Sequence, residues 1–388
     1  MAFLLIASFF ITSIIFNYIN FVNCWLSDVY VPFFIADKLY YVRTNTIFYI
    51  DLVGVSLDNN TIVYASNWVN INVSKLNIDY LPKDSFLGGK ANDKIFFVSN
   101  HSKELRLHAF DATLKKLEAN ISYQGVLNAY YNFDEINWIS DEQTSKSYIY
   151  DTYVGGDANL TIFDSNNLAW INGTSNPQNL LQGILGSSQI IVSYHSFVQV
   201  LSASDKIFYI GGRISGSSFT IQFMPMKNIL IYDIVSDSWL INNATGNEIE
   251  GRTGHTAVMT TDKRIIVYGG LNKLRPALPY LAVLDTSNIP YEWSAPTEEN
   301  SIGPITEHSS IMIKNYMITA FGRNLSERDD AKYDIKDVYK LNISNPLSYK
   351  WSLLATPNNQ SNSVDNNSSI FDSINTKTDG VSVFNQTP

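Results

Sequence analysis

The chain of 388 residues contains a single cysteine, Cys24. One thiol can form neither an intramolecular disulfide nor a thiolate zinc site, so the fold has to be stabilised by packing. Charged residues make up only 16% of the sequence, and the formal net charge is −9. An acidic chain of this kind argues against nucleic acid and against an anionic membrane surface as partners.

Helical periodicity is missing as well, since no long segment repeats its apolar residues every three or four positions. Apolar residues nevertheless reach 45%, and aromatic residues reach 13% with 23 tyrosines and 21 phenylalanines. This content is sufficient for a sizeable core. An all-β chain of this length can fold as one domain.

The N-terminal segment lacks lysine and arginine and begins MAFLLIASFFITSIIF. This apolar run is typical of a signal peptide over residues 1–24, cleaved near Cys24. Two alternatives stay open because the basic n-region is absent: residues 1–22 are long enough for an uncleaved membrane anchor, and they could also form a buried first strand. We predict a secreted or cell-surface protein, with a membrane as partner only if the anchor is retained.

Asn-x-Ser/Thr sequons are frequent, and each is a glycosylation acceptor only if the chain enters the secretory route. Chance alone produces several of them in a chain rich in Asn and Ser, so they support export without establishing it. The candidate acceptors before the tail are Asn59, Asn72, Asn100, Asn120, Asn159, Asn172, Asn243, Asn324 and Asn342. The tail itself, residues 356–388, is polar and of low complexity, and we predict that it is disordered.

A short apolar run recurs six times along the chain. The runs end at or beside Val42, Val98, Val154, Ile210, Tyr268 and Phe321, in steps of 56, 56, 56, 58 and 53 residues. Near-constant spacing over six copies indicates a repeat architecture.

The fourth copy shows what one repeat contains. Residues 195–201 alternate as a first strand, residues 207–210 form a second, residues 229–234 a third, and residues 239–241 a fourth. Four antiparallel strands in about 55 residues make one blade of a β-propeller. We predict an all-β propeller of about six four-stranded blades over residues 28–355. A seventh blade and the way in which the ring closes stay open.

The order of apolar strand, Gly-Gly, Tyr and then Trp resembles the kelch repeat. The positions that carry the resemblance are Gly155, Gly156, Trp170, Gly211, Gly212, Tyr232, Trp239, Gly269, Gly270, Trp293, Gly322, Tyr339 and Trp351. Repeats one and two have Arg43-Thr44 and Ser99-Asn100 where the glycine pair would stand. The resemblance implies a kelch-type propeller in which the glycines permit close passage of strands and the aromatic residues pack between blades.

No catalytic constellation is evident. His195, His255 and His308 open the first strands of three successive repeats, so each would lie in a different blade, and capping of a turn is favoured over metal binding. The related galactose-oxidase-like propellers use copper and a Tyr–Cys cross-link, which the mature chain could not form without a cysteine. We therefore predict no enzymatic activity, no catalytic residue, no metal and no cofactor.

Loops between the second and third strands carry basic residues, of which Arg213, Arg275 and Arg323 are candidate binding residues. Such loops gather on one face of a propeller, and binding residues are often on loops. Ordinary surface charge is the alternative. We predict a non-enzymatic, exported kelch propeller that binds a protein or glycan. The alternatives are an intracellular kelch adaptor and a degenerate galactose-oxidase-like protein.

Overall fold

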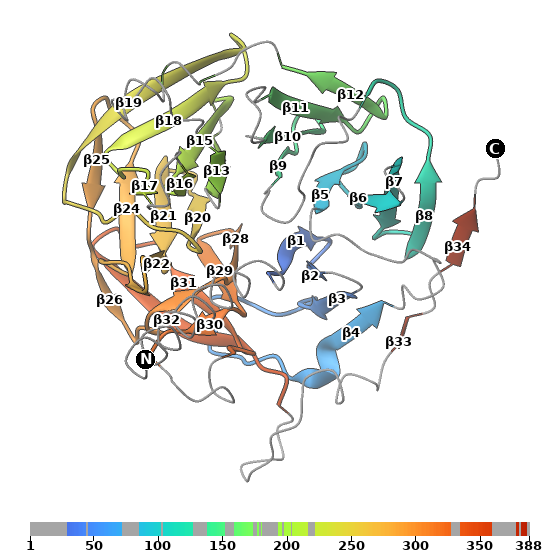
Figure 1. Cartoon of the computed structure of the whole chain (residues 1–388). Helices are drawn as coiled ribbons and strands as arrows, with labels where there is room; N and C mark the ends of the chain where they lie inside the picture. Colours follow the sequence, from blue (N-terminus) through green and yellow to red (C-terminus); the bar gives the residue numbers. More distant parts are fainter. Residues whose placement is uncertain are drawn as a thin grey trace, which may run out of the picture.

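The strands form six four-stranded antiparallel sheets, which follow one another around a ring (Figure 1). The computed structural model of the chain describes residues 29–43, 46–71, 85–101, 104–126, 138–151, 159–173, 177, 180, 193–195, 198–202, 204–215, 222–326, 334–358, 378–379 and 382–385. Within these residues the prediction of an all-β propeller with six four-stranded blades is confirmed.

Each blade takes its four strands in chain order, from the axis of the ring outward. Blade one contains β1 (Val31–Ile35), β2 (Lys38–Arg43), β3 (Thr46–Asp51) and β4 (Trp68–Ile71). Blade two contains β5 (Ser85–Gly88), β6 (Lys94–His101), β7 (Glu104–Asp111) and β8 (Lys116–Ile121). Blade three contains β9 (Ile139–Asp141), β10 (Lys146–Asp151), β11 (Asn159–Asp164) and β12 (Ala169–Asn172). Blade four contains β14 (Val198–Ser202), β15 (Lys206–Ile210), β18 (Asn228–Asp233) and β19 (Ser238–Gly246). Blade five contains β20 (Thr256–Met259), β21 (Arg264–Tyr268), β24 (Leu281–Asp285) and β25 (Tyr291–Ser294). Blade six contains β28 (Ser309–Ile313), β29 (Tyr316–Ala320), β31 (Val338–Asn342) and β32 (Ser348–Ala355). The sequence period marks the second strand of every blade.

The same main-chain hydrogen bond recurs in all six blades. The residue that follows the third strand donates its N–H to a carbonyl in the turn between the first and second strands. The pairs are Leu52 to Asp37, Ala112 to Asp93, Ser165 to Ser145, Ile234 to Asp205, Thr286 to Lys263 and Ile343 to Asn315, at 2.8–3.1 Å. Blades one and two therefore share this bond with the others, although their sequences lack the glycine pair.

An Asp or Asn ends the third strand of every blade and caps the turn that follows. Its Oδ1 accepts a main-chain N–H two or three residues later, at 2.7–3.0 Å. The capping residues are Asp51, Asp111, Asp164, Asp233, Asp285 and Asn342. Such side chains stabilise turns by bonding to nearby main-chain groups. This Asp or Asn recurs in every repeat of the sequence as the last residue of the third strand. It is not one of the glycine and aromatic positions by which the sequence resembles the kelch repeat.

The hydrophobic core is divided into six clusters, each of which joins two neighbouring blades. Aromatic rings cross these seams. Tyr150 of blade three packs against Trp239 of blade four with ring centroids 4.8 Å apart, and Tyr268 of blade five packs against Trp351 of blade six at 4.7 Å. Because a blade buries its faces only against its neighbours, the blades stabilise one another.

The seam between blades six and one closes the ring without sharing a strand. Tyr30, just before β1, packs against Phe321, just after β29, with centroids 4.5 Å apart. Main-chain bonds join the same blades, since Val63 donates to Leu354 and Thr356 donates back to Val63, both at 2.9 Å. All four main strands of each blade come from one stretch of sequence, so packing between complete blades closes the ring.

The ring-closing seam also buries a charged side chain. Lys340 is 2% exposed, and its Nζ donates to the carbonyls of Leu57 and Asn59, each at 2.5 Å. Both carbonyls belong to the long β3–β4 connection, which includes the 3₁₀ turn η1 (Ala65–Asn67). Lys340 therefore attaches this connection of blade one to the third strand of blade six.

Further strands are added in parallel at the outer edges of several blades. The end of β19 pairs with β25 of the next blade, and β26 (Thr297–Glu299), which follows blade five, pairs with β32. Near the C-terminus, β33 (Thr378–Asp379) pairs with β4 and β34 (Ser382–Asn385) pairs with β8 (Figure 1). We predicted disorder for residues 356–388, and these two strands differ from it, whereas residues 359–377, 380–381 and 386–388 of that tail lie outside the described residues. β33 continues the pattern in which the chain leaving one blade crosses the edge of the next, and β34 extends it to the blade after that.

The predicted leader, residues 1–24, lies outside the described residues. Over the part of the chain that the structure does describe, no helix has the length and apolar character needed to cross a membrane.

Candidate binding face

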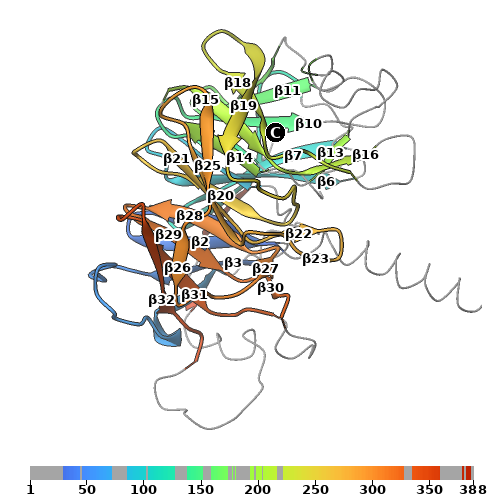
Figure 2. The same ribbon diagram turned by 90° about the vertical axis from the view of Figure 1, so that its left-hand side faces the viewer.

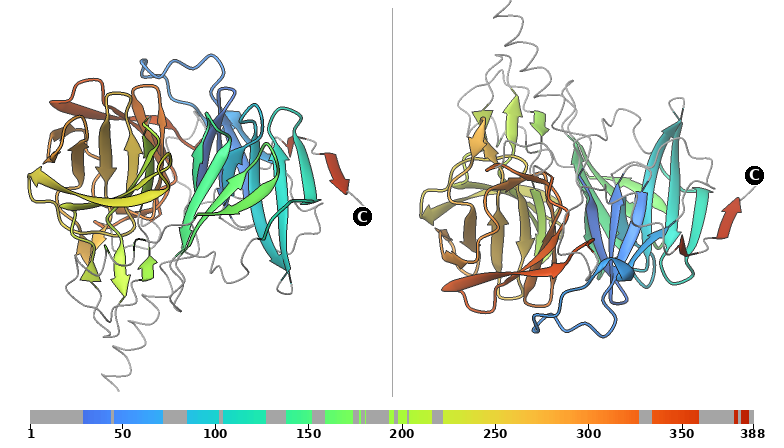
Figure 3. Two further views of the ribbon diagram at one scale, coloured as in Figure 1. Left: turned by 90° about the horizontal axis from the view of Figure 1, so that it is seen from above. Right: turned by 90° about the horizontal axis from the view of Figure 1, so that it is seen from below.

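Three small sheets project from the same side of the ring, which we call the ribbon face (Figures 2 and 3). They are built by β13 (Ser193–His195), β16 (Arg213–Ser215) and β17 (Gln222–Phe223) in blade four, by β22 (Leu271–Asn272) and β23 (Arg275–Pro276) in blade five, and by β27 (Ile305–Thr306) and β30 (Arg323–Asn324) in blade six. Most of these strands lie in the connections between second and third strands. We call the opposite side, which carries the turns between third and fourth strands, the turn face.

The glycine pairs let the ribbon-face connections of neighbouring blades pass close to one another. Gly269 has φ +67°, and a Cβ placed on it would lie 2.3 Å from the carbonyl oxygen of Ile305 and 2.8 Å from Cε1 of His308. Gly211 is similar, because its Cβ would lie 2.6 Å from Cε1 of His255. Only glycine combines this conformation with this contact. The residues Gly155 and Gly156 lie outside the described residues.

His255 and His308 link blades rather than cap turns, which differs from the role that we favoured from the sequence. Nε2 of His255 donates to the carbonyl of Ile210 in the preceding blade, at 3.1 Å. Nε2 of His308 lies 2.7 Å from Oγ1 of Thr256, again in the preceding blade. Burial lowers the pKa of both imidazoles to about 3, so both are neutral at physiological pH.

The prediction that His195 opens the first strand of blade four is wrong. His195 ends β13, a ribbon strand that pairs with Arg213 of β16, whereas the first strand is β14 and begins at Val198. The alternating pattern of residues 195–201 runs across both strands, so periodicity alone could not separate them.

Arg252 is a buried residue whose role the sequence did not disclose. It is 0% exposed, and its guanidinium donates to the carbonyls of Glu250, Gly269 and Leu278 at 3.0–3.1 Å. Burial lowers its pKa to about 10, so it remains a cation at neutral pH. Arg252 thereby joins the glycine pair of blade five to the β23–β24 connection.

The arginines named from the sequence differ in their surroundings. Arg275 makes a bidentate ion pair with Glu250, with distances of 2.8 and 2.6 Å, and Arg323 lies 3.3 Å from a carboxylate oxygen of Glu307. Arg213 lies in β16, and only its main chain is described. The charges of Arg275 and Arg323 are thus balanced by carboxylates, and each ion pair helps to hold the ribbon of its own blade in place.

Apolar side chains are exposed on the blade-five ribbon. Leu274, in the β22–β23 turn, is 68% exposed, and Leu278, just after β23, is 49% exposed. In the sequence these two leucines flank Arg275, whose side chain forms an ion pair with Glu250. An exposed aliphatic pair with a balanced charged pair beside it is suited to contact with another protein surface.

Comparisons with known proteins agree with this architecture. Residues 194–375 match the family model described as the KLHDC2/KLHL20/DRC7 kelch-repeats domain. The chain therefore contains a kelch-repeat domain, and its described residues form a β-propeller. The solved structure titled "Structure of YjhT" is similar to it with a TM-score of 0.55 at 8% sequence identity, covering 84% of this chain and 97% of that one. That likeness concerns the fold alone. No curated protein matches the chain.

The aromatic positions of this kelch propeller face one another across the third and fourth strands. Phe163 is opposite Trp170 in blade three, and Tyr232 is opposite Trp239 in blade four. The equivalent pairs are Leu284 with Trp293 in blade five, Leu341 with Trp351 in blade six and Ile50 with Trp68 in blade one. Tyr339, which we assigned to this position from the sequence, is opposite Leu353 instead. Blade two has Phe110 opposite Leu117.

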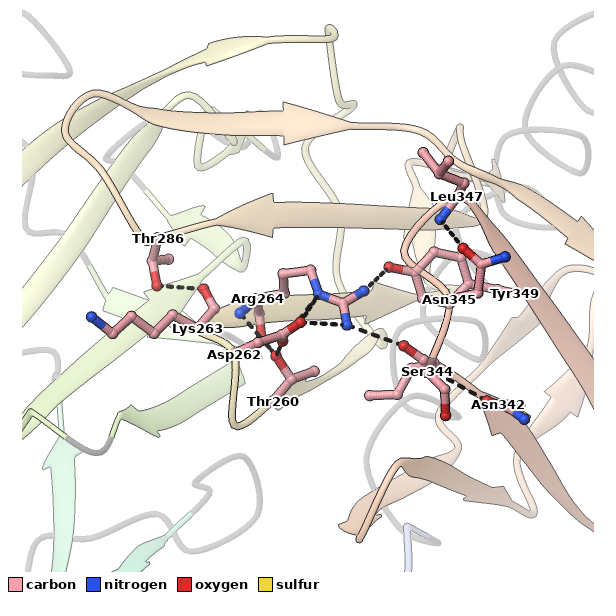
Figure 4. A network of polar contacts seen from close by, with 11 residues as sticks. Thr260, Asp262, Lys263, Arg264, Thr286, Asn342, Ser344, Asn345, Leu347 and Tyr349 are labelled. Carbon is pink, nitrogen blue, oxygen red and sulfur yellow. Dashed lines mark hydrogen bonds and ion pairs between the residues drawn. The ribbon is translucent and has the colours of Figure 1, made fainter. Parts of the chain in front are cut away.

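An arginine on the second strand of blade five contacts the outer half of blade six (Figure 4). Arg264 forms an ion pair with Asp262 of its own blade, at 2.8 Å. It also donates to the carbonyl of Ile343 at 3.1 Å and to the hydroxyl of Tyr349 at 2.5 Å. Arg264 therefore connects the two blades on the turn face.

The predicted glycosylation sites differ in accessibility. Asn59, Asn120, Asn172 and Asn243 are exposed, whereas Asn324 and Asn342 are partly buried and their Oδ1 atoms accept main-chain N–H groups. Asn72 lies outside the described residues, and only the main chain of Asn100 and Asn159 is described. Among the described residues, no group of three or more His, Cys, Asp or Glu could hold a metal ion.

Proposed function

We propose that this kelch propeller is an exported, non-enzymatic protein that binds a protein or glycan partner through its ribbon face. A kelch propeller is a general binding module. The observation that carries the proposal is the exposed pair Leu274 and Leu278 on the blade-five ribbon, beside the Arg275–Glu250 ion pair. Exposed apolar side chains at the tip of a ribbon that its own salt bridge holds in place favour a protein as the partner.

Export is tested by expressing the full chain in eukaryotic cells and following it in the medium. We expect a secreted product whose N-terminus lies close to Cys24 and whose mobility changes after glycosidase treatment. A product that stays in the cytosol with an intact N-terminus would contradict export and favour an intracellular adaptor.

The binding face is tested with purified mature chain, residues 25–388, and intact cells as the probe surface. We expect the double variant Leu274→Asp, Leu278→Asp to lose at least about tenfold in binding, because it places two charges where apolar contacts form. The matched control is Val235→Asp, Leu347→Asp, which alters two exposed residues of the turn face, 80% and 81% exposed. Equal losses in both variants would contradict a role for the ribbon face.

A further inference from the structure

The exposed sequons of the middle blades all lie on the fourth strand of their blade, a few residues beyond one equivalent position. Leu117, Trp170 and Trp239 are equivalent, because each pairs with the residue just before the Asp that ends the third strand. Sequon asparagines follow these three residues by three, two and four positions, at Asn120, Asn172 and Asn243. All three are exposed and belong to the fourth strand of their blade, β8, β12 and β19.

The fourth strand places these side chains at the outer rim. It is the outermost main strand of each blade, and it runs from the turn face toward the ribbon face, since the turn before it lies on the turn face. The amide of Asn243 is engaged through its Oδ1, which accepts from Asn228 at 2.9 Å, and not through the Nδ2 to which a sugar would be attached. A bulky, solvated glycan is compatible with this exposed rim.

The sequon at Asn342 in blade six lies in different surroundings. Nδ2 of Asn342 donates to the hydroxyl of Tyr316 at 3.4 Å, and this hydroxyl donates to Asp58 of blade one at 2.9 Å. Oδ1 of Asn342 accepts the N–H of Ser344. A sugar on Nδ2 would occupy the space of the Tyr316 hydroxyl at the ring-closing seam. The fourth strands β25 and β32 contain no sequon at all.

We infer that N-linked glycans at Asn120, Asn172 and Asn243 cover the outer rim of blades two, three and four, and that Asn342 carries none. This inference rests on the proposed export. The glycans leave the rim of blades five and six uncovered, next to the ribbons that carry Leu274 and Arg323. The modified sector and the binding sector thus lie in different parts of one ring.

The test is glycopeptide mapping of the full chain secreted from eukaryotic cells, made once with its own N-terminus and once with residues 1–24 replaced by an established secretion leader. We expect glycans on all three asparagines. Asn120→Gln, Asn172→Gln and Asn243→Gln should each remove one glycan from the intact mass. The control Ser344→Ala removes the Asn342 sequon but keeps its cap, and should leave the mass of the glycans unchanged.

The two leaders separate this inference from the proposed export. Modification of the three sites only behind the established leader would contradict export and support the rim sites. Unmodified Asn120, Asn172 and Asn243 behind that leader, or a glycan on Asn342, would overturn the inference itself.

Discussion

Gly269 shows how a single residue can be fixed by conformation and contact together. Its φ is +67°, and a Cβ added to it would lie 2.3 Å from the carbonyl oxygen of Ile305, so both its conformation and its surroundings disfavour a side chain. Gly303 has φ +85°, but no atom lies within 4 Å of a Cβ added there. We predict that Gly269→Ala lowers the free energy of unfolding by about 3 kcal/mol and that Gly303→Ala lowers it by about 1 kcal/mol, the cost of the conformation alone. Urea unfolding monitored by tryptophan fluorescence measures both. Equal losses would contradict the part played by the contact.

Lys340 gives a second prediction at this scale, because its buried ammonium donates to two carbonyls across the ring-closing seam. Lys340→Met should lower the free energy of unfolding by about 1–3 kcal/mol, since it leaves both carbonyls without this donor. Lys350→Met is the control. Lys350 is 61% exposed and pairs with Glu299 at 3.5 Å, so its loss should cost less than about 0.5 kcal/mol. A Lys340→Met variant as stable as the parent would show that the ammonium does not stabilise the seam.

The sequence predicted some residues well and others poorly, for a physical reason. Glycines and aromatic residues at strand ends are determined by local conformation and by the repeat, so their pattern is visible along the chain. Lys340 binds carbonyls more than 280 residues away in the sequence, and Arg252 binds two carbonyls 17 and 26 residues away, so a single sequence does not contain that information. The ion pair of Arg275 with Glu250 was missed for the same reason. Arg275, a candidate binding residue in the sequence, has its charge balanced by a carboxylate in the structure.

At the scale of the element, the strands that repeat could be predicted and those that do not repeat could not. The second strand of every blade followed from the period. The ribbon strands β13, β22 and β27 were missed because each is two or three residues long, too short for an alternation to be recognised. These strands build the face on which the proposed function depends, so the sequence indicated the scaffold better than the candidate site.

Arg264 tests the coupling between two elements, because it bonds to Tyr349 and to the Ile343 carbonyl of the next blade. Arg264→Met should lower the free energy of unfolding by about 1–2 kcal/mol. Tyr349→Phe removes only the hydroxyl. In a double-mutant cycle of these two changes we expect a coupling energy of at least about 0.5 kcal/mol. Strict additivity would mean that the pair in Figure 4 contributes nothing between the blades.

The stability of the whole molecule should depend on pH through its buried histidines. Burial lowers the pKa of His255 and His308 to about 3, and burial with the nearby charge of Arg106 lowers that of His108 to about 4. The unfolded chain binds these protons near pH 6.5, so the stabilisation is complete above that pH and is lost as the pH falls from there toward the folded-state pKa values of about 3 to 4. Each histidine contributes a slope of up to about 1.4 kcal/mol per pH unit.

Urea unfolding between about pH 7 and pH 4.5 measures this dependence. The control His108→Gln should reduce the slope by about one third, because one of the three protons no longer binds on unfolding. A free energy of unfolding that stays constant from about pH 6.5 to pH 5 would show that the imidazoles are charged in the folded protein.

The ring-closing seam has a consequence for how such a chain could have changed in evolution. Since no blade takes main strands from both ends of the chain among the residues that the structure describes, duplication or loss of one repeat of about 55 residues would leave every remaining blade complete. Only the seam between the last and first blades would need new partners. At this seam Tyr30 and Phe321 stand where blades five and six use a histidine against a glycine.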